Sequence, residues 1–394
     1  MTEVILTAGM RTPFGDFGKS LKDVPLAQLG AHAVTACLTK AGLDARHVDH
    51  LVFGNVAPVD QDGHFISRKV ALTAGLPLDS SAVTVNRACA SGSQAIASAA
   101  QEILTGDSQV AIAAGGENFS RVGYVARGVR WGAKRGPTTL EDGIDHVYRC
   151  PFGGQLMGET ADELADRYGY DRAAMDQWGL MSQQRAQAAI ENGFLAAQIA
   201  PIEVTEGKTS RVMDCDEFPR FGITLEKLAS LKPAFRKDGR VTPGNSSGVT
   251  DGACAVLVAR RDRAKELGID PEARLVGWSL AGVPPEIMGA GPVPAIAKLL
   301  HRFDLKVADI DYFEINEAFA AVNLHAEKEL GISRERTNLY GGGISIGHPP
   351  GATGVRMTIT AMHHLARSGG RFAVVSMCVG GGQGMATLIE NLHR

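Results

Sequence analysis

The feature that most constrains the fold is an internal repeat. In each half of the chain, apolar β-branched runs alternate with segments of helical periodicity in the same order. The halves also share short motifs, since Ala90-Ser91-Gly92 matches Ala352-Thr353-Gly354 and Val48-Asp49-His50 matches Ile310-Asp311-Tyr312. Strands that alternate with helices predict mainly parallel sheets covered by helices. Two similar halves predict packing about a pseudo-twofold axis.

The repeated elements can be placed by residue number. In the first half the patterns predict strands at 4–8, 50–56 and 110–116 and helices at 26–41 and 89–104. In the second half they predict strands at 274–280, 310–315 and 372–377 and helices at 294–303 and 353–367. Between the halves, 120–243 breaks the repeat, is rich in charge, Gly and Pro, and contains one strong helix at 172–192.

Composition limits the class of protein. The 394 residues are 44% hydrophobic and only 6% aromatic, with 47 glycines, which suits two or three α/β lobes. The formal charge of −3 gives no reason to expect nucleic acid. No apolar run approaches the roughly 20 residues of a membrane span, and the first residues lack the layout of a secretory signal. We therefore expect a cytoplasmic protein with no membrane span.

The six cysteines indicate neither a zinc site nor a disulfide framework. They are scattered, with no C-x-x-C pair and no histidine at ligand spacing, so at least some are expected to be free thiols. Cys37 and Cys254 lie in apolar segments and are interpreted as packing residues.

Cys89 lies where an apolar run at 83–85 passes into a helix. Unpaired N–H groups and the helix dipole at such a position lower the pKa of a thiol and stabilise its thiolate. The alternative is a buried small hydrophobic residue, as most free cysteines are. This stretch alone leaves both interpretations open.

Three further strand-end turns bear polar groups in the second half. The Gly-rich entry at 341–351 contains His348, and the repeat makes that histidine the natural partner of Cys89. Asn316 and Cys378 each follow or end a hydrophobic strand, where sites of α/β sheets lie. Taken singly, His348 could be a local hydrogen-bonding residue, Asn316 a helix N-cap and Cys378 a buried strand end. Together, the four turns indicate an active site.

At these residues the sequence closely resembles the thiolases, which are acetyl-CoA acetyltransferases and 3-ketoacyl-CoA thiolases. The resemblance extends from about Arg11 to the C-terminus and rests on four blocks in order. These blocks are the Cys89 segment, 316–320 (NEAFA), 347–349 (GHP) and 378–384 (CVGGGQG). Secondary blocks around Met157, Ser247 and Met288 agree.

The resemblance implies an α/β fold, namely a duplicated thiolase fold of five αβαβα layers with an inserted loop domain. It implies an N-terminal half at 1–120, completed by about 244–270, a CoA-binding loop domain at 121–243, and a C-terminal half at 271–394. Thiolases are similar to one another in forming dimers that often pair into tetramers through the loop domain, so a homodimer or homotetramer is expected.

The resemblance also implies the chemistry, which is reversible thiolytic cleavage of 3-ketoacyl-CoA by CoA through an acyl-Cys89 intermediate. His348 would be the base for Cys89, and Cys378 the second acid/base, at the α-carbon. His348 and a water held by Asn316 would form one oxyanion hole, and the N–H groups of Cys89 and Gly380 the other. No metal or redox cofactor is expected, because CoA and its thioesters are the substrates.

By the same resemblance, Arg220 and Ser247 would contact CoA, and Met157 would line its pantetheine channel. Met288 and Phe319, which lie in signature blocks, join the substrate-binding set. A concentration of Lys and Arg in the insertion suits the phosphates of CoA. Its members are Lys208, Arg211, Arg220, Lys227, Lys232, Arg236, Lys237 and Arg240.

Two features bear on chain length. Leu156 stands where biosynthetic short-chain members usually have His, which favours a wider acyl pocket. The segment 124–141 resembles degradative, mitochondrial-type thiolases of fatty-acid β-oxidation. A short-chain biosynthetic acetoacetyl-CoA thiolase is the alternative.

Rival functions remain. A decarboxylating ketoacyl synthase of the same superfold is disfavoured by Cys378, and a non-catalytic acyl-CoA-binding subunit by the intact set Cys89, His348, Asn316 and Cys378. A thiol-based redox sensor remains a further possibility.

Overall fold

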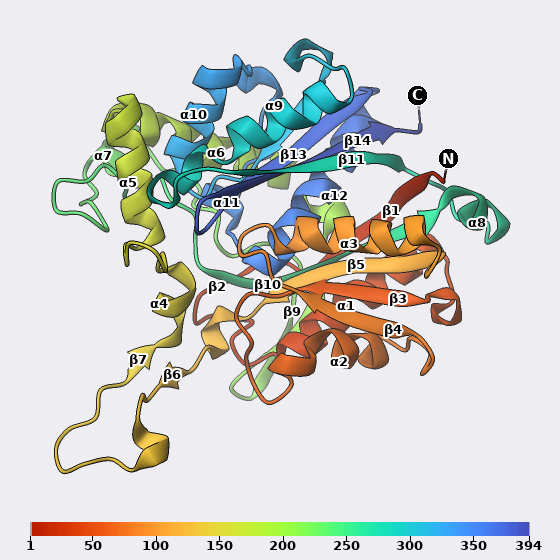
Figure 1. The fold of residues 1–394 in the computed structure, drawn as a ribbon, viewed down its shortest axis with the longest axis horizontal. Helices are drawn as coiled ribbons and strands as arrows, with labels where there is room; N and C mark the ends of the chain where they lie inside the picture. The colour runs from red at the N-terminus through yellow and green to blue at the C-terminus, as the bar shows by residue number, and fades with distance from the viewer. Residues whose placement is uncertain (1, 394) are drawn as a thin grey trace.

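A computed structural model describes residues 2–393, and both predicted halves are present in it (Figure 1). Strands and helices alternate through the first half, and one strand, β10, returns to it after the insertion. The elements are β1 (Val4–Arg11), α1 (Leu26–Ala41), β3 (His50–Gly54), α2 (Ile66–Thr73), β4 (Ser81–Val85), α3 (Ser91–Thr105), β5 (Val110–Glu117) and β10 (Thr250–Arg260).

The second half repeats this order except at one point. Its elements are β11 (Ala273–Gly282), α9 (Pro292–Arg302), β12 (Tyr312–Ile315), α10 (Ala320–Leu330), α12 (Pro350–Ser368), β13 (Phe372–Val379) and β14 (Gln383–Asn391). The described residues of this half have no strand between α10 and α12, where the first half has β4. All ten predicted elements of the repeat are confirmed, with ends shifted by a few residues. The patterns had not indicated α2 or α10.

The same hydrogen bonds recur in both halves. The Oδ2 atom of Asp49 accepts bonds from the N–H groups of Gln109 and Val110, at 2.7 and 2.9 Å. The Oδ2 atom of Asp311 likewise accepts bonds from Arg371 and Phe372, at 2.7 and 2.9 Å. The shared motif at these aspartates therefore has a structural cause, because each carboxylate precedes one strand and fixes the start of its parallel neighbour, β5 beside β3 and β13 beside β12.

The prediction of mainly parallel sheets is wrong. Among the named strands of residues 2–393, parallel pairing is confined to β3 with β4, β3 with β5, and β12 with β13. The strands run in the order β12-β13-β14-β11-β1-β10-β5-β3-β4, and the other neighbours on this path are antiparallel. The cause is local for β13 and β14, because a short glycine turn joins them, and such a turn can only reverse the chain.

Helices cover the sheets in three layers, as Figure 1 shows. Helix α1 packs on β1 and β10, whereas α9 packs on β11 and β14 on the other side of the molecule. Helices α3 and α12 lie in the middle and share one apolar cluster with residues of both halves, such as Ile96 and Val375. The five-layered α/β fold is thus present.

The two central helices touch through their backbones. A Cβ atom on Gly92 would lie 2.9 Å from the N atom of Val355 and 3.0 Å from that of Gly354. A Cβ on Gly354 would in turn lie 2.9 Å from the carbonyl carbon of Gly92. Only glycine permits this approach, and the repeated motif therefore marks the contact between the halves.

The insertion is more ordered than its composition predicts. Beside the predicted helix, α6 (Arg172–Glu191), it contains α4 (Gly143–Tyr148), α5 (Met157–Tyr168), α7 (Leu225–Ala229) and a hairpin of β8 (Ile202–Glu206) and β9 (Thr209–Met213). Helices α5 and α6 pack on α10 of the second half. The pair β6 (Tyr124–Val125) and β7 (Glu141–Asp142) forms an arm that projects from the body at the lower left of Figure 1. The exact limits of the three domains stay a prediction.

Candidate active site

Cys89 lies in a tight turn between β4 and α3. The Oδ1 atom of Asn86 accepts a bond from the N–H of Ala88 at 2.9 Å, and Ser91 Oγ accepts one from the N–H of Arg87 at 2.9 Å. Ala88 has a φ of 42°, a left-handed conformation that is uncommon for a residue with a side chain. Such strain is typical of functional sites and holds Cys89 directly before the first turn of the helix.

The turn does not lower the pKa of Cys89 as the sequence had suggested. Burial raises the pKa of the thiol, and the charge of Glu117 adds to this effect. Hydrogen bonds from the N–H groups of Gly380 and of Cys89 itself oppose it without outweighing it. Desolvation outweighs the N–H groups at the helix start, so the thiol needs a base to become a nucleophile.

His348 lies in the corresponding turn of the second half, immediately before α12, and is buried. The hydroxyl of Thr353 donates to the Pro349 carbonyl at 2.8 Å, so it accepts from His348 Nδ1, which lies 2.7 Å away. The proton is thereby assigned to Nδ1, and Nε2 keeps its lone pair. Burial, aided by the charge of Arg356, lowers the pKa of His348 to about 3. The ring is therefore neutral and able to accept a proton.

The turns of Cys89 and His348 meet at the end of β3. A Cβ atom on Gly54 would lie 2.7 Å from the backbone of Ser91 and 3.0 Å from the carbonyl oxygen of Gly351. These two residues lie in the first turns of the helices that follow Cys89 and His348. The structure thus brings together the two turns that the repeat had paired. The prediction that the His348 turn ends a strand is wrong, because the short helix α11 (Gly343–Ile346) precedes it.

Asn316 and Glu317 follow β12 and have different partners. Asn316 Nδ2 lies 3.3 Å from His348 Nε2, and the Oδ1 atom of this buried asparagine has no hydrogen-bond partner among the described residues. Glu317 accepts bonds from Trp178 Nε1 at 3.1 Å and Ser182 Oγ at 2.6 Å, both on α6. Asn316 therefore faces the histidine, whereas Glu317 anchors the insertion to the strand end.

Cys378 lies at the end of β13 and is fully buried. Burial raises its pKa well above the ordinary value, and the charge of Cys89 adds to the shift, which means that the two thiols interact. The next residues turn through Gly381 and Gly382, with φ of 85° and 88°. This turn directs the Gly380 N–H at Cys89.

The predicted substrate contacts surround these turns. Met157, Met288 and Phe319 are buried in one apolar cluster together with Cys378. A Cβ on Gly380 would lie 3.2 Å from Met157 Sδ. Arg220 is exposed, and its guanidinium lies 5.4 Å from the centre of the Phe218 ring.

Ser247 is half-buried and donates its backbone N–H to the carbonyl of Ala318 at 2.9 Å. The ring of Phe218 lies against the adjacent Gly248, because a Cβ on that glycine would overlap it. Arg220 and Ser247 therefore share a neighbourhood. The Gly248 carbonyl also accepts the His348 N–H at 3.1 Å, which links this neighbourhood to the base.

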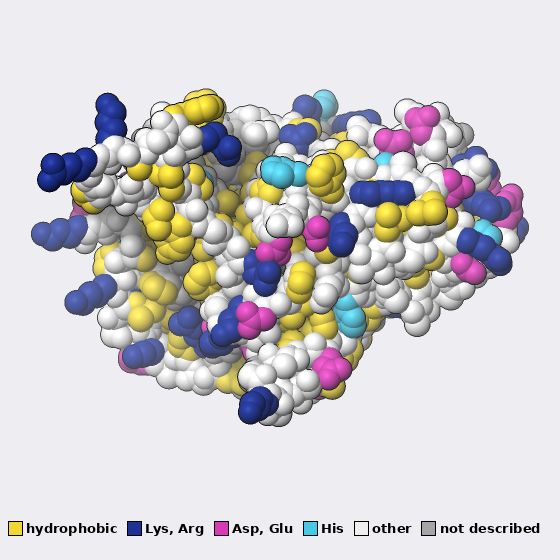
Figure 2. Space-filling model, turned by 90° about the horizontal axis from the view of Figure 1, so that it is seen from below, with side chains coloured by type: hydrophobic (Ala, Val, Ile, Leu, Met, Phe, Trp, Pro, Cys, Tyr) yellow, Lys and Arg dark blue, Asp and Glu magenta, His cyan; other side chains and the backbone are white. Residues whose placement is uncertain are grey.

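The predicted cationic cluster is only partly available to a ligand. Arg236 and Arg240 pair with Asp166 at 2.9 and 2.5 Å, and Arg211 pairs with Glu217 at 3.3 Å. Figure 2 shows lysine and arginine side chains projecting from the left end of the molecule, where Figure 1 places α5 and α7. Exposed members of the cluster in this region include Lys227, Lys232 and Lys237.

Some residues of the site were not predicted. Burial raises the pKa of Glu117, at the end of β5, to about 8, and the pKa of Asp251 on β10 to about 6. Tyr148, at the end of α4, interacts with both carboxylates and with Cys89, and packs 5.5 Å from the Phe119 ring. The position of Glu117 directly after Gly115 and Gly116 at a strand end was the available signal.

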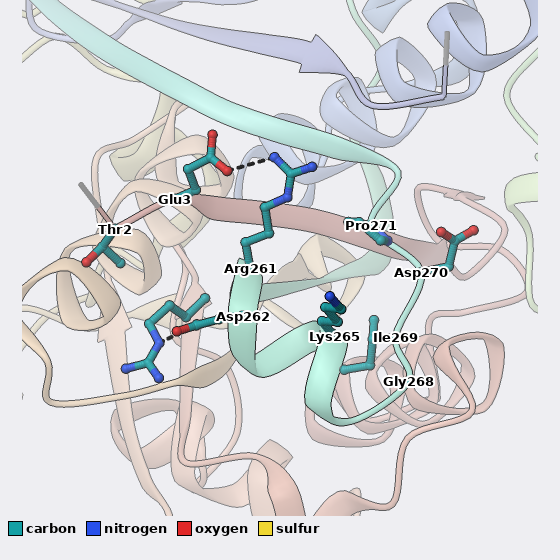
Figure 3. A pocket seen from close by; sticks show the side chains of 10 residues that line it. Thr2, Glu3, Arg261, Asp262, Lys265, Gly268, Ile269, Asp270 and Pro271 are labelled. Atoms are coloured by element: carbon teal, nitrogen blue, oxygen red, sulfur yellow. Dashed lines mark hydrogen bonds and ion pairs between the residues drawn. The ribbon is translucent and has the colours of Figure 1, made fainter.

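A surface cavity of about 1080 Å³ lies elsewhere, at the opposite end of the strands (Figure 3). Four of its charged groups form pairs, since Arg261 pairs with Glu3 at 2.7 Å and Arg260 with Asp262 at 2.5 Å. None of the predicted site residues lines it. Between residues 2 and 393 there is no group of three or more His, Cys, Asp or Glu placed to hold a metal ion, and no helix long and apolar enough to cross a membrane.

Comparison with known proteins decides the family. A model of the thiolase N-terminal domain matches residues 4–262, and a model of the thiolase C-terminal domain matches residues 269–391. The chain belongs to the thiolase family. It is an enzyme, and its reaction is thiolytic cleavage of 3-ketoacyl thioesters with the reverse condensation.

Individual relatives cover the chain almost completely. Beta-ketothiolase BktB of Cupriavidus necator is 45% identical over 99% of each chain, and an acetyl-CoA acetyltransferase of Pseudomonas aeruginosa is 42% identical over 98% of each. The crystal structure of human mitochondrial 3-ketoacyl-CoA thiolase in complex with CoA superposes with a TM-score of 0.96 at 40% identity, covering 99% of this thiolase and 98% of that chain.

The tautomer of His348 can be tested with Thr353→Val, which keeps the shape of the side chain and removes the hydroxyl. We expect kcat for thiolysis to fall about 10-fold to 100-fold with little change in KM, because nothing then holds the proton on Nδ1. Steady-state kinetics measures this split.

Thr358→Val is the matched control, because Thr358 lies on the same helix and makes the same kind of bond, to the carbonyl of Gly354 at 2.9 Å. Equal kcat values for Thr353→Val and Thr358→Val would contradict the assignment.

Proposed function

We propose that Cys89 forms the acyl-enzyme intermediate of this thiolase. His348 Nε2 takes the proton of the Cys89 thiol, and the thiolate attacks the 3-keto carbonyl of the substrate. The bond between C2 and C3 then breaks, and its electron pair stays with the acetyl-CoA fragment. Cys378 donates a proton to that carbon, which releases acetyl-CoA and leaves a Cys378 thiolate.

CoA completes the cycle. Its thiol gives a proton to the Cys378 thiolate and attacks the thioester on Cys89. Cys89 leaves as a thiolate and recovers its proton from His348, so that protons and charges balance. The observation that supports this scheme best is the convergence of three turns on Cys89, with the Gly380 N–H directed at its sulfur.

Two oxyanion sites follow from the same geometry. The Cys89 and Gly380 N–H groups are suited to an oxygen on the carbon attached to Cys89, because both already point at the sulfur. His348 and Asn316, 3.3 Å apart, are suited to the thioester oxygen of acetyl-CoA. The free Oδ1 of Asn316 can hold a water for that purpose. Since every step transfers a proton or an acyl group, the scheme needs no metal or redox cofactor.

CoA is the proposed ligand of the insertion. The human relative was solved in complex with CoA, and this chain presents Arg220 and Ser247 beside the base and an apolar wall of Met157, Met288 and Phe319. The exposed lysines 227, 232 and 237 supply positive charge for phosphates.

We propose a broad acyl-chain range and a degradative role in fatty-acid β-oxidation. Leu156 is half-buried at the start of α5, directly before Met157. An apolar side chain here leaves the pocket suited to alkyl groups. The short-chain biosynthetic alternative keeps some support, because one relative is named an acetyl-CoA acetyltransferase.

The proposed assembly is a homotetramer, built as a pair of dimers. Strand β4 ends the sheet, and Val83 on it is 39% exposed, so a second copy can pair along this edge. The arm is rich in exposed apolar groups, of which Trp131 is 87% exposed and Leu140 60%. Such groups are typical of a contact between protein chains. A cytoplasmic location also stays a prediction.

Replacing the nucleophile tests the reaction. We expect Cys89→Ala to lower kcat for thiolysis of 3-ketoacyl-CoA by at least about 1000-fold, because no acyl-enzyme can form. Calorimetry should show unchanged CoA binding. Full turnover in this variant would exclude Cys89 as nucleophile, and saturable CoA binding without turnover in the unmodified protein would favour a binding subunit.

The chain-length proposal is tested by Leu156→His. We expect kcat/KM for 3-ketodecanoyl-CoA to fall about 10-fold relative to that for acetoacetyl-CoA, because a polar ring disfavours an alkyl chain. Leu267→His, a half-buried leucine at the opposite end of the strands, serves as control. An unmodified enzyme that cleaves acetoacetyl-CoA alone would support the short-chain alternative.

The arm is tested by Trp131→Ala. Analytical ultracentrifugation should show a tetramer for the unmodified protein and a dimer for the variant, with kcat per chain retained, because the arm lies away from Cys89. Val212→Ala, at another exposed apolar residue (63%), should leave the tetramer intact. A tetramer that survives the loss of Trp131 would place the contact elsewhere.

A further inference from the structure

The active site has a counterpart on the other side of the pseudo-twofold axis. The matching motifs pair Cys89 with Gly351, because each directly precedes its motif, and pair the end of β5 with the end of β13. On one side of this axis, the turn after β13 contacts Cys89 of the first half through the Gly380 N–H. On the other side, the end of β5 contacts Gly351 of the second half, and the group that makes this contact is Glu117.

Glu117 is fully buried and accepts four hydrogen bonds. Oε1 accepts the N–H of Val56 at 2.6 Å and that of Gly351 at 3.2 Å. Oε2 accepts the N–H of Ala57 at 3.1 Å and Asn55 Nδ2 at 2.9 Å. Three of the donors follow β3 in the first half and one belongs to α12 in the second half, so this carboxylate joins the two halves.

The hydrogen bond from the Gly351 N–H to Glu117 lies close to His348, the proposed base. Gly351 lies in the first turn of α12, between His348 and Thr353, whose hydroxyl holds the imidazole. A Cβ on Gly351 would lie 2.9 Å from Glu117 Oε1, so glycine is what allows the carboxylate to approach this backbone. A carboxylate at a helix N-terminus also interacts favourably with the helix dipole.

Glu117 also acts on Cys89 electrostatically. Above its own pKa of about 8, Glu117 is ionised, and its charge raises the pKa of the Cys89 thiol. The other titratable groups that interact with Glu117 are Asp251 on β10 and Tyr148 at the end of α4.

We propose that Glu117 is a positioning residue of this thiolase, which fixes the start of α12, and with it His348, against the turn of Cys89. In alkaline solution, where Glu117 is ionised, its charge additionally disfavours the Cys89 thiolate. The inference rests on the roles proposed above for Cys89 and His348.

The test compares Glu117→Gln with Glu117→Asp. The glutamine removes the charge and turns an N–H₂ group toward N–H donors, whereas the aspartate keeps the charge but is too short to reach all four donors. We expect both to lower kcat for thiolysis about 10-fold or more, with KM changed less than about 2-fold. Steady-state kinetics on the full enzyme gives both values.

Alkylation of Cys89 distinguishes the effect of the Glu117 charge from the effect of Glu117 on the position of α12. The rate of iodoacetamide labelling of the Cys89 peptide, followed by mass spectrometry, is measured from pH 6 to pH 10. We expect the midpoint to move to lower pH in Glu117→Gln by about half a unit, because a negative charge near the thiolate is lost. The midpoint should stay in place in Glu117→Asp. Asp251→Asn, a buried carboxylate that does not bond α12, is the control and should not lower the midpoint.

The outcomes decide the inference. A Glu117→Gln enzyme with unchanged kcat, or with an unchanged or higher alkylation midpoint, would overturn it. If that variant fails to fold, Asn55→Ala removes only one donor and should lower kcat by a smaller factor, and an unchanged kcat there would also overturn it. Activity retained by Cys89→Ala would instead overturn the proposed mechanism, which is a separate result.

Discussion

The contact between the starts of α3 and α12 is the constraint on which the rest of this thiolase depends. Gly92 and Gly354 bring the two backbones together, and the turns that precede these helices hold Cys89 and His348. Any side chain at either glycine would push the helix starts apart. The distance between Cys89 and His348 is therefore set by backbone packing, which varies less than the position of a flexible side chain.

Burial determines the protonation of the site. It raises the pKa values of Cys89 and Cys378 and lowers that of His348. Two neutral thiols and a neutral imidazole thus form the resting site. A neutral resting state costs less in a desolvated pocket than an ion pair would.

Buried ion pairs hold the framework around this neutral site. Arg11 pairs with Asp216 at 2.6 Å and joins β1 to the insertion. Arg356 on α12 pairs with Glu314 on β12, and its charge contributes to the lowered pKa of His348. Removal of one partner would leave an uncompensated buried charge, so these pairs fix the elements that surround the turns.

The sequence by itself determined the two halves, the order of most of their elements and the four polar turns, because periodicity and glycine placement are local properties of the chain. Only the tertiary structure decided that most neighbouring strands are antiparallel and that desolvation outweighs the helix dipole at Cys89. It also decided that Glu117 meets Gly351. Each of these depends on residues distant in sequence, and neither pairing direction nor burial is a property of a segment alone.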